Sequence, residues 1–166
     1  MNRPTVYIES SVVSYYTARQ SRDLLVLSHQ EITRVWWEEH LDTYEPCISG
    51  VVLQELRRGA VDAATLRLAA VSDFRMLPLP AEVESLAAVY VSELGLPEAS
   101  TYDALHIAVA SLHAVDYLVT WNCKHIANAR LRRGLADINQ RMGVSIPVIC
   151  TPEELLNEDI IPDLIS

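Results

Sequence analysis

Short runs of apolar and β-branched residues alternate along this chain with longer segments in which apolar residues recur at helical spacing. The short runs, typical of buried strands, lie at 5–8, 46–48, 74–77, 117–119 and 147–150. The helical segments lie at 22–40, 50–58, 62–72, 81–94, 102–114 and 126–142. Strands separated by helices require crossover connections, so the pattern predicts an α/β fold, a three-layer parallel sheet with helices on both faces.

Small and polar residues mark the ends of several segments. Ser10 and Ser11 predict a turn after the first strand, and Ser49 is a good N-cap for the helix that follows the second. The stretch 151–154 (TPEE) has the capping pattern of a last helix. We therefore divide the chain into a domain over residues 1–150 and a C-terminal helical extension over 151–166, packed on the domain or on a dimer partner.

The composition fits one compact domain. The 166 residues are 50% apolar and 21% charged, which excludes disorder, and the apolar stretches are too interrupted for a membrane-spanning helix. The first four residues lead directly into a strand, so no secretory signal is expected. Three scattered cysteines without a C-x-x-C pair exclude a disulfide framework and a structural zinc site. We expect a cytoplasmic protein with no membrane partner.

Charge is unevenly distributed along the chain. The net charge is −9, yet residues 120–143 carry a local charge of +4, which leaves −13 for the remainder. The cations of this segment are Lys124, Arg130, Arg132, Arg133 and Arg141. The net charge argues against non-specific nucleic-acid binding, whereas the basic segment would suit the phosphate backbone of a selected RNA. An ordinary solvated helix face is the alternative explanation.

Four oxygen-bearing side chains lie near the carboxyl ends of the predicted strands. Glu9 directly follows the first strand, and Asn122 comes just after the strand at 117–119. Glu55 lies in the helix after the second strand, and Asp103 lies in the first turn of an apolar helix. Because ligands of open parallel sheets bind beyond the carboxyl ends of the strands, we expect these side chains to converge at one crevice.

Each of the four also has a purely structural interpretation. Asp103 can be a first-turn helix acid, Glu55 a surface residue beside a buried stripe, and Asn122 a turn residue. Glu9 is harder to explain in this way, because an acid beside a buried strand needs a partner or a metal.

Four motifs, taken in order, are similar to those of PIN-domain nucleases. The segment 6–11 (VYIESS) resembles the family's opening strand with its acid, and 49–56 (SGVVLQEL) resembles the second acidic motif. The segment 102–108 (YDALHIA) is similar to the third, D-A-x-x-A-A, and 118–122 (LVTWN) to the fourth, which normally ends Thr-x-Asp. Each motif is weak alone, but the ordered set is fairly specific and covers nearly the whole chain.

The resemblance implies a PIN-like fold and a divalent-metal-dependent endoribonuclease, most often the toxin of a VapC-type toxin–antitoxin pair. Glu9, Glu55 and Asp103 would then bind Mg²⁺ or Mn²⁺, with Asn122 in the fourth acidic position and Ser11 supporting the metal or the scissile phosphate. Hard divalent ions prefer such oxygen ligands and promote in-line attack by water on a phosphodiester. An RNA substrate, a cognate antitoxin and a homodimer are the implied partners.

Two residues depart from the family pattern. Glu9 stands in place of Asp, which adds a methylene, and Asn122 stands in place of Asp, which removes a charge. A site with three ionised acids supports one divalent cation better than two, so we expect a single, weaker metal site and slow or selective activity. His125 is a candidate replacement ligand or, more simply, a histidine at a helix start.

Other residues are candidates for substrate binding. Trp121 stands beside the predicted crevice, where its ring could stack on a base. Lys124, Arg130 and Arg133 form the best track for a phosphate backbone. His106 lies one turn from Asp103, although a core histidine is the simpler explanation.

Two alternative functions remain open at this point. The chain could be a catalytically weakened PIN module that binds RNA or a protein partner without cleavage, which the Asn at position 122 and the acidic net charge favour. It could also be an unrelated small α/β enzyme that acts on phosphorylated metabolites, although no G-x-x-x-x-G-K-[ST] loop is present.

Overall fold

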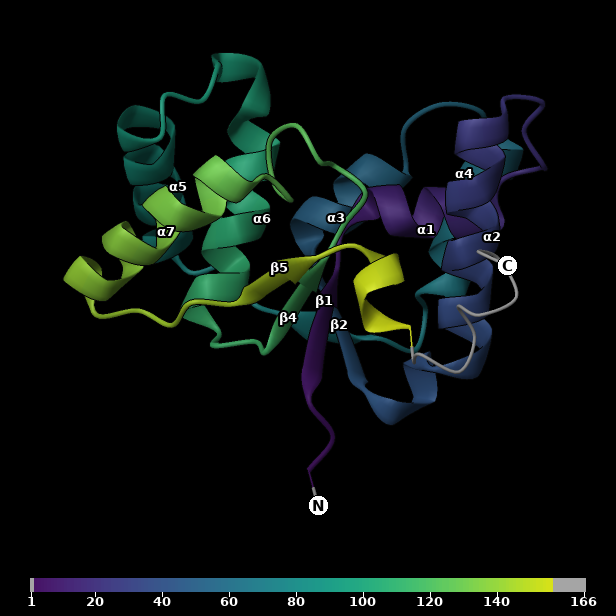
Figure 1. The fold of residues 1–166 in the computed structure, drawn as a ribbon, viewed down its shortest axis with the longest axis horizontal. Coiled ribbons are helices and arrows are strands. Elements are labelled where there is room, and N and C mark those ends of the chain that lie inside the picture. The colour runs from purple at the N-terminus through teal and green to yellow at the C-terminus, as the bar shows by residue number, and fades with distance from the viewer. Residues whose placement is uncertain (1, 157–166) are drawn as a thin grey trace, which may run out of the picture.

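The computed structural model describes residues 2–156, and within them five strands form one parallel sheet in the order β3-β2-β1-β4-β5 (Figure 1). The strands are β1 Thr5–Ile8, β2 Glu45–Ser49, β3 Arg75–Leu77, β4 Tyr117–Val119 and β5 Val148–Cys150. Tyr7 of the central strand β1 pairs with Cys47 of β2 and with Leu118 of β4. This sheet confirms the predicted α/β class.

Helices cover the sheet on both sides. The α-helices are α1 Ser10–Thr17, α2 Leu24–Glu39, α3 Gly50–Leu56, α4 Val61–Ala70, α5 Ala81–Glu93, α6 Thr101–Leu112 and α7 Ala129–Met142. Short 3-10 helices are η1 Leu41–Thr43, η2 Glu98–Ser100 and η3 Pro152–Leu155. In Figure 1, α5, α6 and α7 lie on one side of the sheet, and α1, α2 and α4 lie on the other. The three-layer arrangement is therefore present.

The order of the strands reverses at β1. From β1 the chain adds β2 and then β3 on one side, and it later returns to add β4 and β5 on the other side. Two neighbouring parallel strands whose connections leave in opposite directions open a crevice at their carboxyl ends, which is where ligands of such sheets bind. The topology therefore places a candidate site beyond Ile8 and Val119.

Two element boundaries differ from the sequence-based prediction. The Ser-rich turn expected after the first strand is wrong, because α1 begins at Ser10 with Glu9 as its N-cap. The helix predicted from residue 126 begins only at Ala129, because Asn128 accepts hydrogen bonds from the N–H groups of Arg130 and Leu131. In both cases a side chain that caps the helix sets its first turn.

The predicted C-terminal extension is described only in part. The capping box expected at Thr151 is present, with Glu154 as its second member, but it opens the four-residue 3-10 helix η3. Residues 157–166 of the predicted extension lie outside the described residues, and the division of the chain at residue 150 stays a prediction. Among residues 2–156, no helix is both long enough and apolar enough to cross a membrane.

Candidate active site at the carboxyl ends of β1 and β4

Four elements contribute the predicted site residues. Glu9 directly follows β1, and Asn122 lies three residues beyond β4. Glu55 comes from α3, which Ser49 caps by accepting the N–H of Val51 at 3.2 Å. Asp103 lies in the first turn of α6. The switch in strand order thus places the polar ends of β1 and β4 together, as the sequence predicted.

Glu9 is a buried acid, with 4% of its surface exposed. Its carboxylate accepts hydrogen bonds from the Ser11 N–H at 3.0 Å, from the Thr120 hydroxyl at 2.8 Å and from the Ser11 hydroxyl. The Ser10 hydroxyl lies 3.0 Å from its other oxygen. These donors satisfy the oxygens of a side chain that is largely removed from water.

Glu55 is half-buried and lies close to Glu9. Its Oε1 lies 3.1 Å from the Ser10 hydroxyl and is hydrogen-bonded to Nε2 of His106. Burial raises the pKa of Glu55, but the hydrogen bond and charge of His106, the Ser10 hydroxyl and the Arg58 charge together outweigh burial, so the net shift of this pKa is downward. Glu55 is therefore held as a carboxylate.

Glu9, Glu55 and His106 form a compact group. Each offers one ligand atom, and these three atoms lie within 4.8 Å of one another. In the described part of the chain this is the one group of three or more such side chains with that spacing, and Asp103 is not a member. Two of the three acids predicted as ligands are therefore together, and a histidine completes the group in the structure.

Asp103 lies beside this group and contacts Asn122. The Asn122 side-chain amide donates to Oδ1 of Asp103 at 3.0 Å, and its own oxygen accepts the N–H of His125 at 3.0 Å. Burial raises the pKa of Asp103, and the charges of Glu9 and Glu55 add to this, although His106 and His125 oppose it. The negative charges of Glu9 and Glu55 therefore make ionisation of Asp103 less favourable.

The residues of this group fit a divalent cation. The Ser10 hydroxyl is within hydrogen-bond distance of both Glu9 and Glu55, but a hydroxyl carries one proton and donates to one carboxylate at a time. The two carboxylates are thus close enough to share one hydroxyl, although each also has hydrogen-bond partners of its own. Carboxylate oxygens are the ligands that Mg²⁺ and Mn²⁺ prefer, and His106 is hydrogen-bonded to one of them.

Sequence reasoning gave His106 no definite role. It interpreted His106 most simply as a core histidine, and the side chain is indeed fully buried, yet both ring nitrogens make polar contacts. The available signal was its spacing of three residues from Asp103, which places both side chains on one face of α6. Thr120 was also missed as a partner of Glu9, although it ends the apolar run of β4.

Ser11 and Trp121 have structural partners. The Ser11 hydroxyl donates to Glu9 and accepts the N–H of Trp121 at 2.9 Å, so it connects β1 to the segment after β4. The Trp121 ring is 9% exposed, stacks on His29 at 4.1 Å and donates to the Thr33 hydroxyl at 2.7 Å. These contacts give Trp121 a packing role, and base stacking by this ring stays a prediction.

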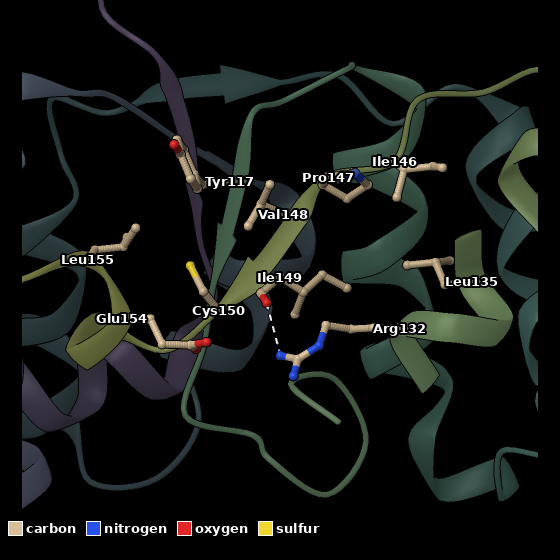
Figure 2. A pocket seen from close by; sticks show the side chains of 10 residues that line it. All are labelled: Tyr117, Arg132, Leu135, Ile146, Pro147, Val148, Ile149, Cys150, Glu154 and Leu155. Carbon is tan, nitrogen blue, oxygen red and sulfur yellow. Dashed lines mark hydrogen bonds between the residues drawn. The ribbon is translucent and has the colours of Figure 1, made fainter. Parts of the chain in front are cut away.

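The basic segment divides into two groups. Lys124, Arg130 and Arg133 are exposed, whereas Arg132 turns toward the edge strand β5. Figure 2 shows Arg132 donating to the carbonyl oxygen of Ile149, at 3.1 Å, in a cavity of about 540 Å³ that contains none of the site acids. Arg132 therefore covers a backbone group of the open sheet edge, and Arg141 pairs with Glu93. Among the described residues, Lys124, Arg130 and Arg133 have no ion-pair partner and can reach a ligand.

Comparison with known proteins supports the family that the four sequence motifs resemble. The PIN domain family model matches residues 6–131, a span that contains all four predicted site residues. The solved structure of VapBC2 from Rickettsia felis bound to a DNA fragment from their promoter is similar at a TM-score of 0.49 and 15% identity, covering 89% of this chain and 98% of that chain. No curated protein matches the sequence. The match over most of the chain, together with the parallel sheet and its acidic crevice, shows that this chain belongs to the PIN domain family.

Proposed function

We propose that this PIN domain is a divalent-metal-dependent endoribonuclease, acting as the toxin of a VapC-type toxin–antitoxin pair. PIN domains are generally nucleases. The observation that carries the proposal is the group of Glu9, Glu55 and His106 within 4.8 Å at the carboxyl end of β1. The Ser10 hydroxyl lies within hydrogen-bond distance of both carboxylates, which places the two acids close enough to bind one cation.

Glu9 and Glu55 would hold Mg²⁺ or Mn²⁺, and Asp103 would complete the site from the first turn of α6. When bound, the ion supplies a Lewis acid that activates water and neutralises charge on the phosphoryl oxygens. Ser11, Ser10 and Thr120 fix the Glu9 carboxylate before a ligand arrives, which lowers the cost of organising the site. Asn122 orients Asp103 through its amide.

Cleavage of RNA by the purified protein tests the proposal. With Mn²⁺ we expect cleavage that excess chelator abolishes, and a loss of at least about 100-fold in the Glu55→Gln variant, which keeps the size of the side chain but removes its charge. The exposed Glu82 of α5 provides the matched control, because Glu82→Gln makes the same chemical change away from the site. Undiminished cleavage in chelator and in Glu55→Gln would refute the proposal.

The alternative is a PIN module that binds RNA or a protein partner without cutting. The contact between Asn122 and Asp103 favours it, because an amide donor compensates this acid without a cation. Calorimetric titration with Mn²⁺ separates the two functions. Binding at micromolar to low millimolar Mn²⁺ supports the nuclease, and absence of binding at millimolar concentration supports the module.

Two partners accompany the proposed toxin function. A cognate antitoxin would block the crevice with a basic residue of its own, and a second copy of the chain would form a homodimer. Light scattering on the purified protein tests the dimer, with a mass near twice 18.6 kDa as the expected result. A small DNA-binding protein encoded beside this chain, which inhibits its ribonuclease activity when the two are mixed, would establish the antitoxin.

A further inference from the structure

A buried line of polar groups leads from the middle of the fold to Glu55. The Ser49 hydroxyl lies 2.8 Å from the Tyr7 hydroxyl, which lies 2.7 Å from Nδ1 of His106. Nε2 of His106 is hydrogen-bonded to Oε1 of Glu55. Ser49, Tyr7 and His106 each have 0% exposed surface. These groups come from β2, β1 and α6, so the fold has placed four polar side chains in contact where apolar packing would otherwise be expected.

The hydrogen-bond partners give this line a direction. A carboxylate only accepts, so Nε2 of His106 carries the proton that Glu55 receives. In the tautomer with its proton on Nε2, Nδ1 is an acceptor, to which the Tyr7 hydroxyl can donate. The Tyr7 oxygen in turn accepts from Ser49, whose own oxygen accepts the N–H of Val51 at 3.2 Å. With each group donating to the next, from Ser49 through Tyr7 and His106 to Glu55, every one of these buried groups has a hydrogen-bond partner.

The two carboxylate oxygens of Glu55 differ in their hydrogen-bond partners. Oε1 is the atom within reach of both the Ser10 hydroxyl and His106. No hydrogen bond from the described residues reaches Oε2. A carboxylate held by one oxygen presents the other in a fixed direction, and hydrogen bonds of this kind orient metal ligands in proteins.

We propose that His106 is a positioning residue that orients Glu55 as a metal ligand, with Tyr7 and Ser49 fixing the tautomer of its ring. The inference rests on the proposed metal-dependent function. His106 acts through Glu55 and does not itself contact the metal, because its Nε2 proton is engaged by the carboxylate. Its burial among β1, β2 and α6 keeps water from competing for that hydrogen bond.

Two substitutions at position 106 test the contributions of the two ring nitrogens separately. In His106→Gln the side-chain amide reaches the position of Nε2 and can still donate to Glu55. In His106→Asn the amide lies near the position of Nδ1, so the contact with Tyr7 can persist but the donor to Glu55 is lost. We expect His106→Asn to weaken Mn²⁺ binding, measured by calorimetry, about 10–100-fold. His106→Gln should restore most of the affinity.

A second variant removes the hydroxyl group of Tyr7, which lies between Ser49 and His106. Tyr7→Phe takes away the hydroxyl that donates to Nδ1, and we expect a smaller loss of Mn²⁺ affinity than in His106→Asn. Tyr90→Phe is the matched control, because Tyr90 is also fully buried and its hydroxyl donates to Asn139 at 2.6 Å, outside the site. Tyr7→Phe removes buried hydrogen bonds with Ser49 and His106, and Tyr90→Phe removes the one to Asn139. Both changes lower the melting temperature, but only Tyr7→Phe should change Mn²⁺ affinity.

The outcomes distinguish this inference from the function on which it rests. If the wild-type protein binds no Mn²⁺ at millimolar concentration, the proposed metal-dependent function fails and this inference fails with it. If the wild-type protein binds Mn²⁺ and His106→Asn binds it equally well, or His106→Gln is as weak as His106→Asn, only the positioning role is overturned. A directly coordinated nitrogen in the pulsed EPR spectrum of the Mn²⁺ complex would likewise overturn it, because it would make a histidine a ligand.

Discussion

Glu9 combines two tasks that are often separate in proteins. Its carboxylate caps α1 by accepting the N–H of Ser11, and the same carboxylate belongs to the group that fits a cation. A capping residue cannot move without fraying the first turn of its helix, so this acid is held in place before any ligand binds. The longer side chain of Glu, compared with the Asp usual in the resembling motif, still reaches the Thr120 hydroxyl at 2.8 Å.

Asn122 and Asp103 form the contact in which this chain departs most from the family's pattern. Asn122→Asp keeps the oxygen that accepts the His125 N–H but replaces the donor to Asp103 with a second carboxylate. We expect the metal-free protein to lose about 1–3 kcal/mol of unfolding free energy, and to show a larger rise in melting temperature with Mn²⁺ than the wild-type protein. Thermal unfolding with and without Mn²⁺ measures both effects.

Asn122→Ala is the control for this prediction, because it removes the amide without adding charge. It should lower the melting temperature in the absence of metal but add nothing to the Mn²⁺-dependent rise. If Asn122→Asp and Asn122→Ala respond equally to Mn²⁺, the fourth position of the motif does not contribute to cation binding.

Asp103 and Glu55 should affect stability in opposite directions. The pKa of Asp103 is raised from 3.8 by burial and by the Glu9 charge, so its contribution to stability is present below 3.8 and is lost as the pH rises through the raised value. Burial raises the pKa of Glu55, but His106, Ser10 and Arg58 together lower it below 4.5, so its contribution is present above 4.5 and is lost as the pH falls through the lowered value.

In metal-free protein near neutral pH, Asp103→Asn should therefore raise the melting temperature and Glu55→Gln should lower it. Both differences should shrink as the pH falls below the ordinary carboxyl range, where the wild-type acids become protonated. Thermal unfolding between about pH 3 and 7 in chelator measures them. A lower melting temperature for Asp103→Asn near neutral pH would contradict the expectation that the buried Asp103 charge, close to Glu9, destabilises the fold.

The positions of some candidate residues could be predicted from the strands that precede them. Glu9 directly follows β1 and Asn122 comes three residues after β4, so the rule for parallel sheets was sufficient to expect both at the same end of the sheet. His106 was not assigned in this way, because a histidine in an apolar helical stripe gives no sign of its partners. Its contacts with Tyr7 and Glu55 depend on the packing of α6 against β1 and α3, which no local pattern encodes.

At the scale of elements, the pattern of apolar residues predicted the strands and most helices, because the strands are short continuous apolar runs and the buried faces of the helices repeat at about 3.6 residues. It failed at α1, where Ser10 and Ser11 suggested a turn but the Glu9 side chain caps a helix. It also began α7 too early, because the apolar Ile126 lies in the core before the helix starts. Side-chain caps set both boundaries, and the hydrophobic period does not report them.

The start of α7 provides a test of this explanation. Asn128 accepts the N–H groups of Arg130 and Leu131 at 3.1 and 3.4 Å. Asn128→Ala should lower the unfolding free energy by about 1 kcal/mol, a melting-temperature change of roughly 2–4 °C for a domain of this size, whereas Asn128→Asp should retain the cap. Equal melting temperatures for Asn128→Ala and the wild-type protein would show that the cap does not define this helix.

At the scale of the whole molecule, charge is separated between the crevice and a neighbouring segment. The chain carries −9 overall, and the acids of the crevice would repel an RNA backbone on their own. Lys124, Arg130 and Arg133 are exposed on the segment that follows β4 and on α7, the part of the chain that also supplies Asn122. An anionic ligand would therefore be attracted to this part of the chain, which favours selective over general RNA binding.

This separation predicts a modest and localised salt dependence of RNA binding. Each lysine or arginine that neutralises a phosphate of a single strand contributes about 0.7 to the slope of log affinity against log salt. Arg130→Ala and Arg133→Ala should each reduce this slope by about that amount, whereas Arg22→Ala, an exposed cation outside the basic segment, should leave it unchanged. Fluorescence anisotropy with labelled RNA in chelator measures the slope while cleavage is suppressed. If all three variants share the wild-type slope, RNA does not bind along the start of α7, and the uneven charge of this chain reflects an ordinary solvated helix face.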